Sequence, residues 1–264
     1  MSDLTAAPTA LTAASLRINA TLAMVTRSVR LSTRNVDALL TSVILPVMIM
    51  LLFVYLFGGA IETGTEYVNY VLPGVLLLCT GYVSALTAIG VTEDVQQGIV
   101  DRLRSMDVGA AALLTGHVAA SVVRNVASAV ITLGVALLIG FRPTAGPLEW
   151  LAAAGMLALF VLAVSWVAAA FGLLANTPEG AGGFTFFIMF LPYPSSAFVP
   201  VETMPTWLHG FAEHQPSTPV IETLRGLLMD TAIGDSAGFA IAWCVGLTVL
   251  AMLASGLLFR RRTA

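Results

Sequence analysis

Long apolar runs separated by short polar segments divide this chain from about residue 38 to its end. Six such runs occupy residues 38–59, 70–91, 110–141, 150–175, 180–199 and 236–259. A bilayer core is about 30 Å thick and a helix rises about 1.5 Å per residue, so each run is long enough to cross a membrane. We therefore predict an all-α integral membrane protein with six transmembrane helices, forming a single membrane domain over residues 1–264.

The stretch before the first run, residues 14–34, has the pattern of an amphipathic helix. Apolar residues lie on one stripe and arginines lie nearly opposite: Ile18, Leu22, Val25 and Val29 against Arg27, Arg30 and Arg34. Such a helix binds at a membrane surface, with its arginines attracted by anionic headgroups. We predict an N-terminal interfacial helix that leads into the first span.

A charged segment, residues 92–108, separates the second and third runs. It carries six charged residues in a chain that has 12 basic and 15 acidic residues in all. Ile99, Leu103 and Met106 fall on one helical face, and Asp101 and Arg104 point away from it. The pattern predicts a short amphipathic helix that offers a charged face to a partner. A solvated loop is the alternative, since charged runs between spans usually form one.

Prolines interrupt the fifth run and the segment that follows it. Pro192, Pro194 and Pro200 predict a kinked or unwound outer half of the fifth span. Residues 201–235 are too polar for a span and too apolar for an ordinary loop, which suggests a re-entrant helical hairpin, with two helices lying flat on the surface as the alternative. Within it we expect two apolar faces to pack together: Trp207, Leu208 and Phe211 against Leu224, Leu227 and Leu228.

Four polar residues stand out inside the runs: Thr80, Ser84, Thr87 and Arg124. The three hydroxyls lie at helical spacing, and such groups often bond back to their own helix rather than line a path. A charge at mid-bilayer costs about 2.5–3.5 kcal/mol, so we expect Arg124 to face the protein interior and to pair with an acid or with backbone carbonyls.

Composition excludes several kinds of site. The chain is 58% hydrophobic and 10% charged, whereas soluble domains are about 25% charged. All 12 basic residues are arginines, so the lysine of a phosphate-binding P-loop is missing. Cys79 and Cys244 lie in apolar runs with neither disulfide nor metal-ligand spacing, and we interpret them as small buried hydrophobic residues. We predict no catalytic, cofactor or metal site in this chain.

The distribution of arginines predicts the orientation in the membrane. If both termini are cytoplasmic, that side receives nine arginines and the outside receives Arg142 and Arg225. Because positive charge accumulates on the cytoplasmic side, we predict a multi-pass protein of the cell membrane with both termini inside. The segment 92–108 then faces the cytoplasm and the hairpin 201–235 faces outward.

Two motifs carry a resemblance to a known family. The first is D-x-x-x-G-I-V-D-R-L-R-S at 94–105, and the second extends from Phe198 to Gly226, with F-V-P-V-E-T-M-P-T-W-L followed by F-A-E-H-Q-P-S-T-P-V-I-E-T-L-R-G. Together with the order of elements from Ala14 onward, they resemble the membrane (permease) subunit of ATP-binding-cassette exporters of the daunorubicin-resistance type. Related sequences usually carry proline after the first motif, where this chain has Asp107 after Met106.

The resemblance implies a permease that forms a homodimer or heterodimer and binds two copies of a separate ATPase subunit, which holds ATP and Mg. It implies an ATPase-coupling helix made of Glu93, Asp94, Gly98, Asp101, Arg102 and Arg104. In such a transporter the hairpin serves as an outer gate, for which the candidate residues are Pro200, Glu202, Pro205, Trp207, Phe211, Pro216, Pro219, Glu222 and Arg225. The expected function is export of an amphipathic drug or lipid-like molecule, driven by the partner's ATP hydrolysis.

Three alternatives remain. A transporter of the same family could export a lipid or a lipid-linked glycan. An intramembrane hydrolase would draw on His117, His209 or His214 with Ser195, Ser196 or Ser217, but these residues form no catalytic motif, and surface histidines are the simpler interpretation. Ion-driven secondary transport normally uses buried acids, which the runs lack.

Overall fold

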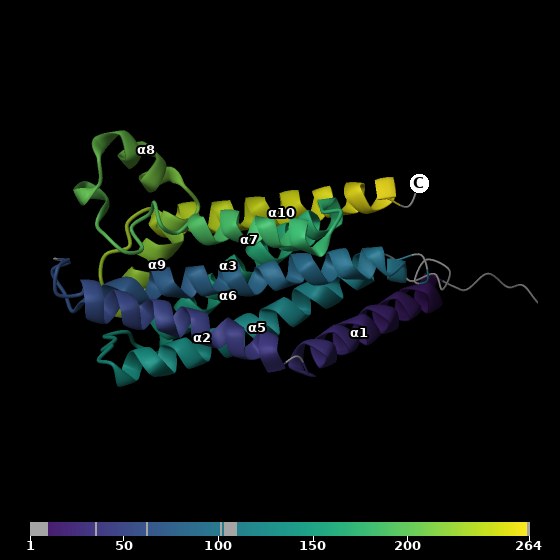
Figure 1. Ribbon diagram of the computed structural model, residues 1–264, viewed down its shortest axis with the longest axis horizontal. Coiled ribbons are helices and arrows are strands. Elements are labelled where there is room, and N and C mark those ends of the chain that lie inside the picture. The colour runs from purple at the N-terminus through teal and green to yellow at the C-terminus, as the bar shows by residue number, and fades with distance from the viewer. Residues whose placement is uncertain (1–9, 35, 62, 101, 103–109, 263–264) are drawn as a thin grey trace, which may run out of the picture.

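The computed structural model describes residues 10–34, 36–61, 63–100, 102 and 110–262, and the regular elements within these ranges are all helices. Figure 1 shows long helices lying side by side along the long axis of the molecule. The start of α1 and the end of α10 lie toward the same end of this bundle. The predicted all-helical architecture is confirmed over the described ranges.

The helices follow one another with short connections. In chain order they are α1 (Ala10–Arg34), α2 (Val36–Leu52) with a π-helical turn η1 (Phe53–Phe57), α3 (Tyr67–Gln96), α5 (Ala110–Leu138), α6 (Pro147–Leu174), α7 (Pro178–Phe190), a 3-10 turn η2 (Val201–Thr203), α8 (Thr206–His214), α9 (Ser217–Met229) and α10 (Ser236–Arg262).

Within the described ranges, five helices are long and apolar enough to cross a membrane. Their qualifying stretches are Leu40–Phe57, Tyr67–Gln96, Ala111–Leu138, Pro147–Leu174 and Ser236–Arg260. They correspond to the first, second, third, fourth and sixth predicted spans. A short connection joins the third and fourth spans, and α6 begins after it with Pro147, where the Glu149 carboxylate accepts a hydrogen bond from the Gly146 backbone N–H.

The fifth predicted span, 180–199, is not one continuous helix. Helix α7 starts with Thr177, whose hydroxyl caps the Gly180 N–H at 3.1 Å, and it ends after 13 residues at Phe190. About 20 residues are needed to cross a bilayer, so α7 is too short to cross one by itself. Turns follow it through Pro192 and Pro194, and the predicted unwinding of the outer half of this segment is therefore confirmed.

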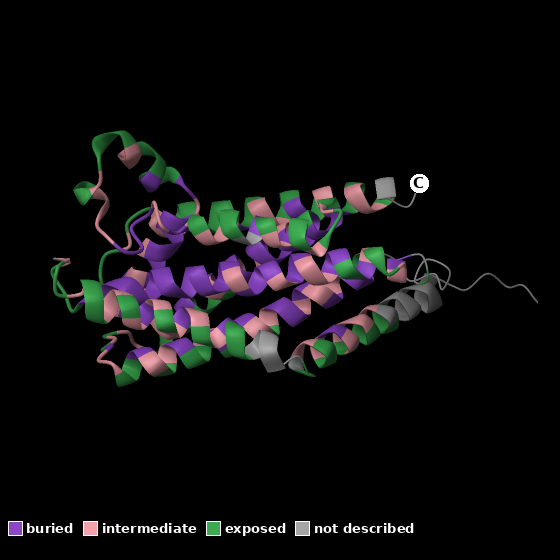
Figure 2. Cartoon of the chain, viewed as in Figure 1, coloured by how far each residue is buried: buried purple, intermediate pink, exposed green. Residues whose placement is uncertain are grey.

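Helix α3 lies at the centre of the bundle. Every residue from Tyr67 to Gly81 is buried, and Figure 2 shows this helix buried along most of its length. Glycines allow its neighbours to approach closely: a Cβ on Gly172 of α6 would stand 2.5 Å from the Ala88 carbonyl oxygen, and one on Gly74 would stand 2.6 Å from the Ala197 Cβ. Helix α3 thus packs against α2, α5, α6, α7 and α9.

Helix α1 packs along α5, with Gly116 of α5 against the Met24 backbone. The predicted apolar stripe does not face the protein at its first two positions, since Ile18 and Leu22 are 61% and 58% exposed. Arg30 and Arg34 are exposed, as expected of a surface helix, but Arg27 turns inward. An outward apolar stripe suits a helix that contacts lipid, and the interfacial position remains a prediction.

The two helices of the predicted hairpin differ in their surroundings. Helix α9 packs against α3, α6 and α10, and nine of its residues are buried, from Ser217 to Leu228. Helix α8 lies at the periphery of the bundle and contributes one buried residue, Ala212 (Figure 1). Only the second arm of the hairpin is therefore part of the core.

Candidate functional site

The end of α3 shows how the central helix passes into the charged segment 92–108. The helix stops at Gln96, and Gly98 adopts a left-handed conformation with φ of +68°. The Gln97 and Gly98 N–H groups bond back to the Glu93 and Val95 carbonyls at 2.9 and 3.2 Å. This conformation ends helices and strongly favours glycine, because it strains residues that carry a Cβ. Gly98 is therefore a defined corner between α3 and the next helical turn, which resumes at Ile99.

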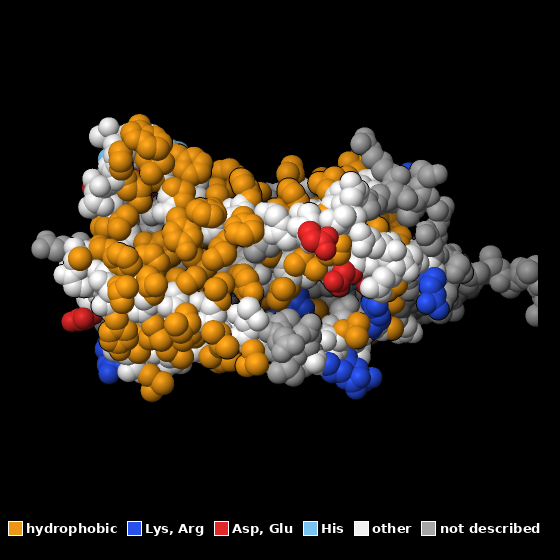
Figure 3. All heavy atoms as spheres, viewed as in Figure 1, with side chains coloured by type: hydrophobic (Ala, Val, Ile, Leu, Met, Phe, Trp, Pro, Cys, Tyr) orange, Lys and Arg blue, Asp and Glu red, His pale blue; other side chains and the backbone are white. Residues whose placement is uncertain are grey.

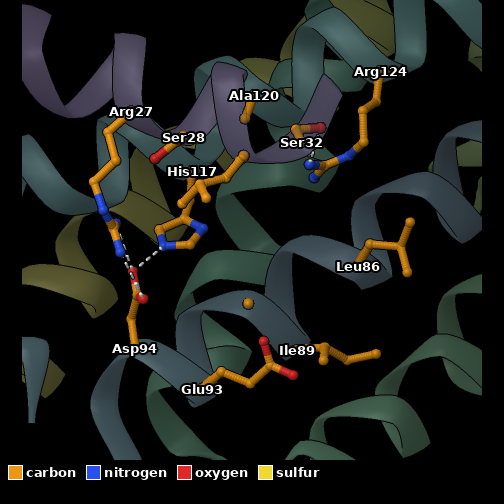
Figure 4. A pocket seen from close by; sticks show the side chains of 12 residues that line it. Arg27, Ser28, Ser32, Leu86, Ile89, Glu93, Asp94, His117, Ala120 and Arg124 are labelled. Atoms are coloured by element: carbon orange, nitrogen blue, oxygen red, sulfur yellow. Dashed lines mark hydrogen bonds and ion pairs between the residues drawn. The ribbon is translucent and has the colours of Figure 1, made fainter. Parts of the chain in front are cut away.

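A buried carboxylate, Asp94, connects three helices just before this corner. The Arg27 guanidinium of α1 donates to both of its oxygens at 3.3 and 3.4 Å, and His117 Nε2 of α5 lies 2.8 Å from Oδ2 (Figure 4). The Asp94 and His117 side chains are only 11% and 15% exposed, whereas Arg27 is 34% exposed. The Asp94 cluster, defined as Arg27, Asp94 and His117, thus ties α1 and α5 to the end of α3.

The structure separates the residues expected in the coupling helix. Glu93 and Arg102 are exposed, and Gly98 forms the corner between them. Asp94 points into the bundle instead, where its partners hold it away from the surface. Asp101 and Arg104 lie outside the described residues, as does Asp107. An exposed docking face can therefore include Glu93 and Arg102, and Asp94 supports that face from inside.

Sequence reasoning missed two members of the Asp94 cluster. Arg27 was assigned to lipid headgroups, and His117 was interpreted as a surface histidine; for His117 this is wrong, since its side chain is largely buried against Asp94. A signal was available in the spacing of His117 and Arg124. Residues seven apart lie on the same face of a helix, so one face of α5 carries both basic groups.

A polar pocket of about 260 Å³ lies between α1, α3 and α5 and includes the Asp94 cluster. Figure 4 shows Arg124 on the side of the pocket away from Arg27 and Asp94. Ser28 and Ser32 of α1 and Glu93 of α3 also line it, with Leu31, Leu86 and Ile89 forming its apolar wall. A pocket that is lined by charged groups is suited to an ionic or zwitterionic ligand.

Arg124 has partners of a kind that the sequence did not predict. Its two Nη atoms donate to Ser32 Oγ at 2.8 Å and Thr87 Oγ1 at 3.0 Å, so both partners are neutral hydroxyls rather than an acid or carbonyls. Ser32 lies at the end of α1, shortly before the apolar stretch that starts at Leu40. Arg124 therefore lies beside the end of α1, close to where the chain passes into the first span.

The three hydroxyls of α3 differ in what they bind. Thr80 donates to the Leu76 carbonyl of its own helix at 3.0 Å, as expected for such a group. Ser84 lies 3.4 Å from Ser165 of α6, and Thr87 accepts from Arg124. Two of the three hydroxyls therefore contact other helices, and Thr87 alone reaches a charged group that lines the pocket.

At the opposite end of the bundle, Arg225 of α9 binds three segments together. Its guanidinium donates to the Tyr70 carbonyl of α3 at 3.1 and 3.3 Å, to the Ser196 carbonyl at 2.6 Å and to the Glu222 carboxylate at 2.8 Å. It also stacks over the Tyr70 ring at 3.8 Å from the centroid. Its side chain is 14% exposed, so this residue is a structural tie between α9, α3 and the segment after α7.

The remaining outer-gate candidates lie around this tie, and the expected packing within the hairpin is wrong. Trp207 and Phe211 of α8 are 80% and 53% exposed, whereas Leu224 and Leu228 of α9 are 1% and 3% exposed and pack into the main core instead. Helix α9 occupies the space between α3, α6 and α10, and α8 lies outside it. Glu202 and Pro205 are exposed, Pro200 and Pro216 are half-buried, and Pro219 is buried.

The candidate hydrolase residues do not converge. His209 and His214 bond to the backbone carbonyls of Met204 and Gly210, and Ser195 donates to the Pro192 carbonyl. The Ser196 and Ser217 hydroxyls are buried without a hydrogen-bond partner within the described ranges. A serine nucleophile requires a base within hydrogen-bond reach, and the hydrogen bonds of these serines and histidines do not join them in such a pair.

Comparison with known proteins identifies similar sequences over most of the chain. Residues 19–229 match the ABC-2 type transporter family. The daunorubicin resistance ABC transporter permease protein DrrB1 of Streptomyces coeruleorubidus is 31% identical over 228 residues, which cover 86% of this chain and 81% of that protein. The probable doxorubicin resistance ABC transporter permease protein DrrC of Mycobacterium tuberculosis is 22% identical over 254 residues, covering 94% of this chain and 91% of that protein.

Proposed function

Because the chain belongs to the ABC-2 type transporter family, we propose that it is the permease subunit of an exporter, driven by ATP hydrolysis in a separate subunit. The proposed cargo is an amphipathic, drug-like molecule, by analogy with the relatives named for daunorubicin and doxorubicin resistance. Two copies of the ATPase and two permease subunits would form the complete transporter. The resistance names belong to those relatives, and their extension to this chain is part of the proposal.

The observation that carries the proposal is the mechanical connection at the end of α3. An ATPase that moves the charged segment 92–108 would act on α3 through the Gly98 corner, and the Asp94 cluster would pass the displacement to α1 and α5. Glu93 and Arg102 stand on the exposed side of this junction, where a partner can reach them. One docking segment could thus move three helices together, as a rigid-body transporter motion requires.

Contacts at the opposite end support a gate. Arg225 fixes α9 to α3 and to the segment after α7, while α7 itself stops short and continues as proline-containing turns. A short helix followed by turns can change its position at a lower free-energy cost than a continuous span. We propose that this end opens outward when the docking-segment end is displaced, with both termini of the chain in the cytoplasm.

The test is transport by the reconstituted complex. The chain would be co-expressed with a candidate ATPase subunit that carries a P-loop, purified, and placed in proteoliposomes with the ATPase sites outside. ATP should drive accumulation of doxorubicin inside the vesicles, and replacement of the ATPase P-loop lysine should abolish it. A parallel panel with a fluorescent phospholipid and a lipid-linked glycan distinguishes drug export from lipid export. A complex that hydrolyses ATP with no response to any of these molecules would contradict the proposed cargo class.

A further inference from the structure

Arg124 is a cation whose contacts leave its charge unbalanced. Both of its hydrogen bonds in the described part of the chain go to neutral hydroxyls, those of Ser32 and Thr87. Its Nε is buried without a hydrogen-bond partner there, and no described carboxylate lies within ion-pair distance of the guanidinium. A guanidinium that is withdrawn from water binds anions strongly when one can reach it.

The acidic groups of the same pocket do not supply the missing charge. Asp94 already binds Arg27 and His117 at the other side of the pocket (Figure 4). Glu93 is exposed at the pocket's edge, where water solvates it. An incoming anion would therefore meet Arg124 together with the Ser32 hydroxyl and the buried Ser28 hydroxyl, whose oxygen has no partner among the described residues.

The position and walls of the pocket indicate the source of such an anion. Arg124 bonds to Ser32, which precedes the apolar stretch of the first span at Leu40, and a pocket beside the start of a span suits a lipid headgroup. Leu31, Leu86 and Ile89 form an apolar wall, and Leu31 is 55% exposed on the outside of α1. Figure 3 shows apolar side chains over most of the face in view and most of its charged side chains near the end where α1 lies.

We propose that this pocket binds the phosphate group of a membrane phospholipid, with Arg124 as its principal partner and the acyl chains outside, along the apolar wall. Basic pockets between transmembrane helices hold lipid headgroups by this combination of charge and apolar contact. The volume of about 260 Å³ is sufficient for a phosphate with its attached alcohol. The proposal concerns binding alone, which can be measured without the ATPase.

The experiment uses the full chain, purified in detergent and stripped of lipid. Binding of palmitoyl-oleoyl phosphatidylglycerol, the matching phosphatidylethanolamine, the matching diacylglycerol and inorganic phosphate would be measured by native mass spectrometry and by thermal shift. Both phospholipids should bind, and the diacylglycerol, which lacks phosphate, should bind at least tenfold more weakly. Inorganic phosphate should also be at least tenfold weaker, because it gains nothing from the apolar wall. Equal binding of diacylglycerol and phosphatidylglycerol would overturn the phosphate assignment, and equal binding of inorganic phosphate would overturn the lipid assignment.

Substitutions at three positions test whether the lipid binds in this pocket. Arg124→Gln should lower phosphatidylglycerol binding at least tenfold, while Arg142→Gln, at the other end of α5, should leave it unchanged. Ala120→Leu fills the pocket from α5 and should also lower binding, with Arg124 intact, so the test survives if Arg124→Gln fails to fold. Wild-type binding in Ala120→Leu, or an equal loss in Arg142→Gln, would show that the lipid binds elsewhere.

Discussion

Replacing Asp94 by asparagine should weaken the connection between α1, α3 and α5 by about 1.5–4 kcal/mol. The change preserves shape but removes the charge that Arg27 and His117 share. The Arg27 contact is long, at 3.3–3.4 Å, and one-third exposed, so it contributes about 0–1 kcal/mol. The His117 contact is short and largely buried, and a hydrogen bond to a charged group of this kind is worth about 1.5–3 kcal/mol.

The assay is a double-mutant cycle in mixed micelles, with unfolding driven by a denaturing detergent. Asp94→Asn, His117→Gln and the double variant would be compared, and the cycle should give a coupling energy of about 1–2 kcal/mol. The matched control is the neighbouring Glu93→Gln, which alters an exposed carboxylate and should change stability by less than about 0.5 kcal/mol. Additive effects of the two cluster variants, or equal effects of Asp94→Asn and Glu93→Gln, would refute the cluster as a structural connection.

Three further predictions concern the outer end and nucleotide binding. Arg225→Gln should lower the free energy of unfolding by about 2–4 kcal/mol and Arg225→Lys nearly as much, because a single ammonium cannot reach the Tyr70, Ser196 and Glu222 oxygens together. The measurement is unfolding of the purified chain, and wild-type stability of Arg225→Lys would contradict the role of the three guanidinium contacts. Trp207→Ala should leave stability within about 0.5 kcal/mol, whereas Leu224→Ala should cost about 2–5 kcal/mol, and similar losses in the same unfolding assay would mean that α8 is packed after all. The isolated chain should bind no ATP in a calorimetric titration, because it contains no lysine and no P-loop; micromolar affinity would remove the separate ATPase from the proposal.

Apolar length and proline positions predicted most of the fold. The long runs became α2, α3, α5, α6 and α10 because burying backbone polar groups in a membrane leaves few structures other than helices. Pro192 and Pro194 predicted where α7 would give way to turns. Each of these signals is local, since it depends on a residue and its near neighbours in the chain.

What the sequence could not predict depends on contacts between distant segments. Arg27 and Asp94 are 67 residues apart, and Tyr70 and Arg225 are 155 apart, so no periodicity relates them. Hydrophobic pattern alone also could not distinguish α8 from α9. Both have an apolar face, and only the space between α3, α6 and α10 determines which one is buried.

The central claim, that segment 92–108 transmits ATPase motion through the Gly98 corner, is tested most directly at Gly98 itself. Gly98→Val should strain the corner, since valine rarely adopts a φ of +68°, while Gly98→Asn should be tolerated because asparagine enters this region more easily. Reversal of both Asp101 and Arg104 is the companion change on the charged face.

The measurement is ATP-driven doxorubicin uptake per ATP hydrolysed, in proteoliposomes that contain the complex with its ATPase. Gly98→Val and the Asp101/Arg104 reversal should lower this ratio at least tenfold, with the reversal more damaging to complex assembly at low salt than at high salt. Gly98→Asn and Gly256→Val, at an uncrowded glycine of α10, should keep the wild-type ratio. Wild-type coupling in both Gly98→Val and the double reversal would contradict the account and make the segment a solvated loop.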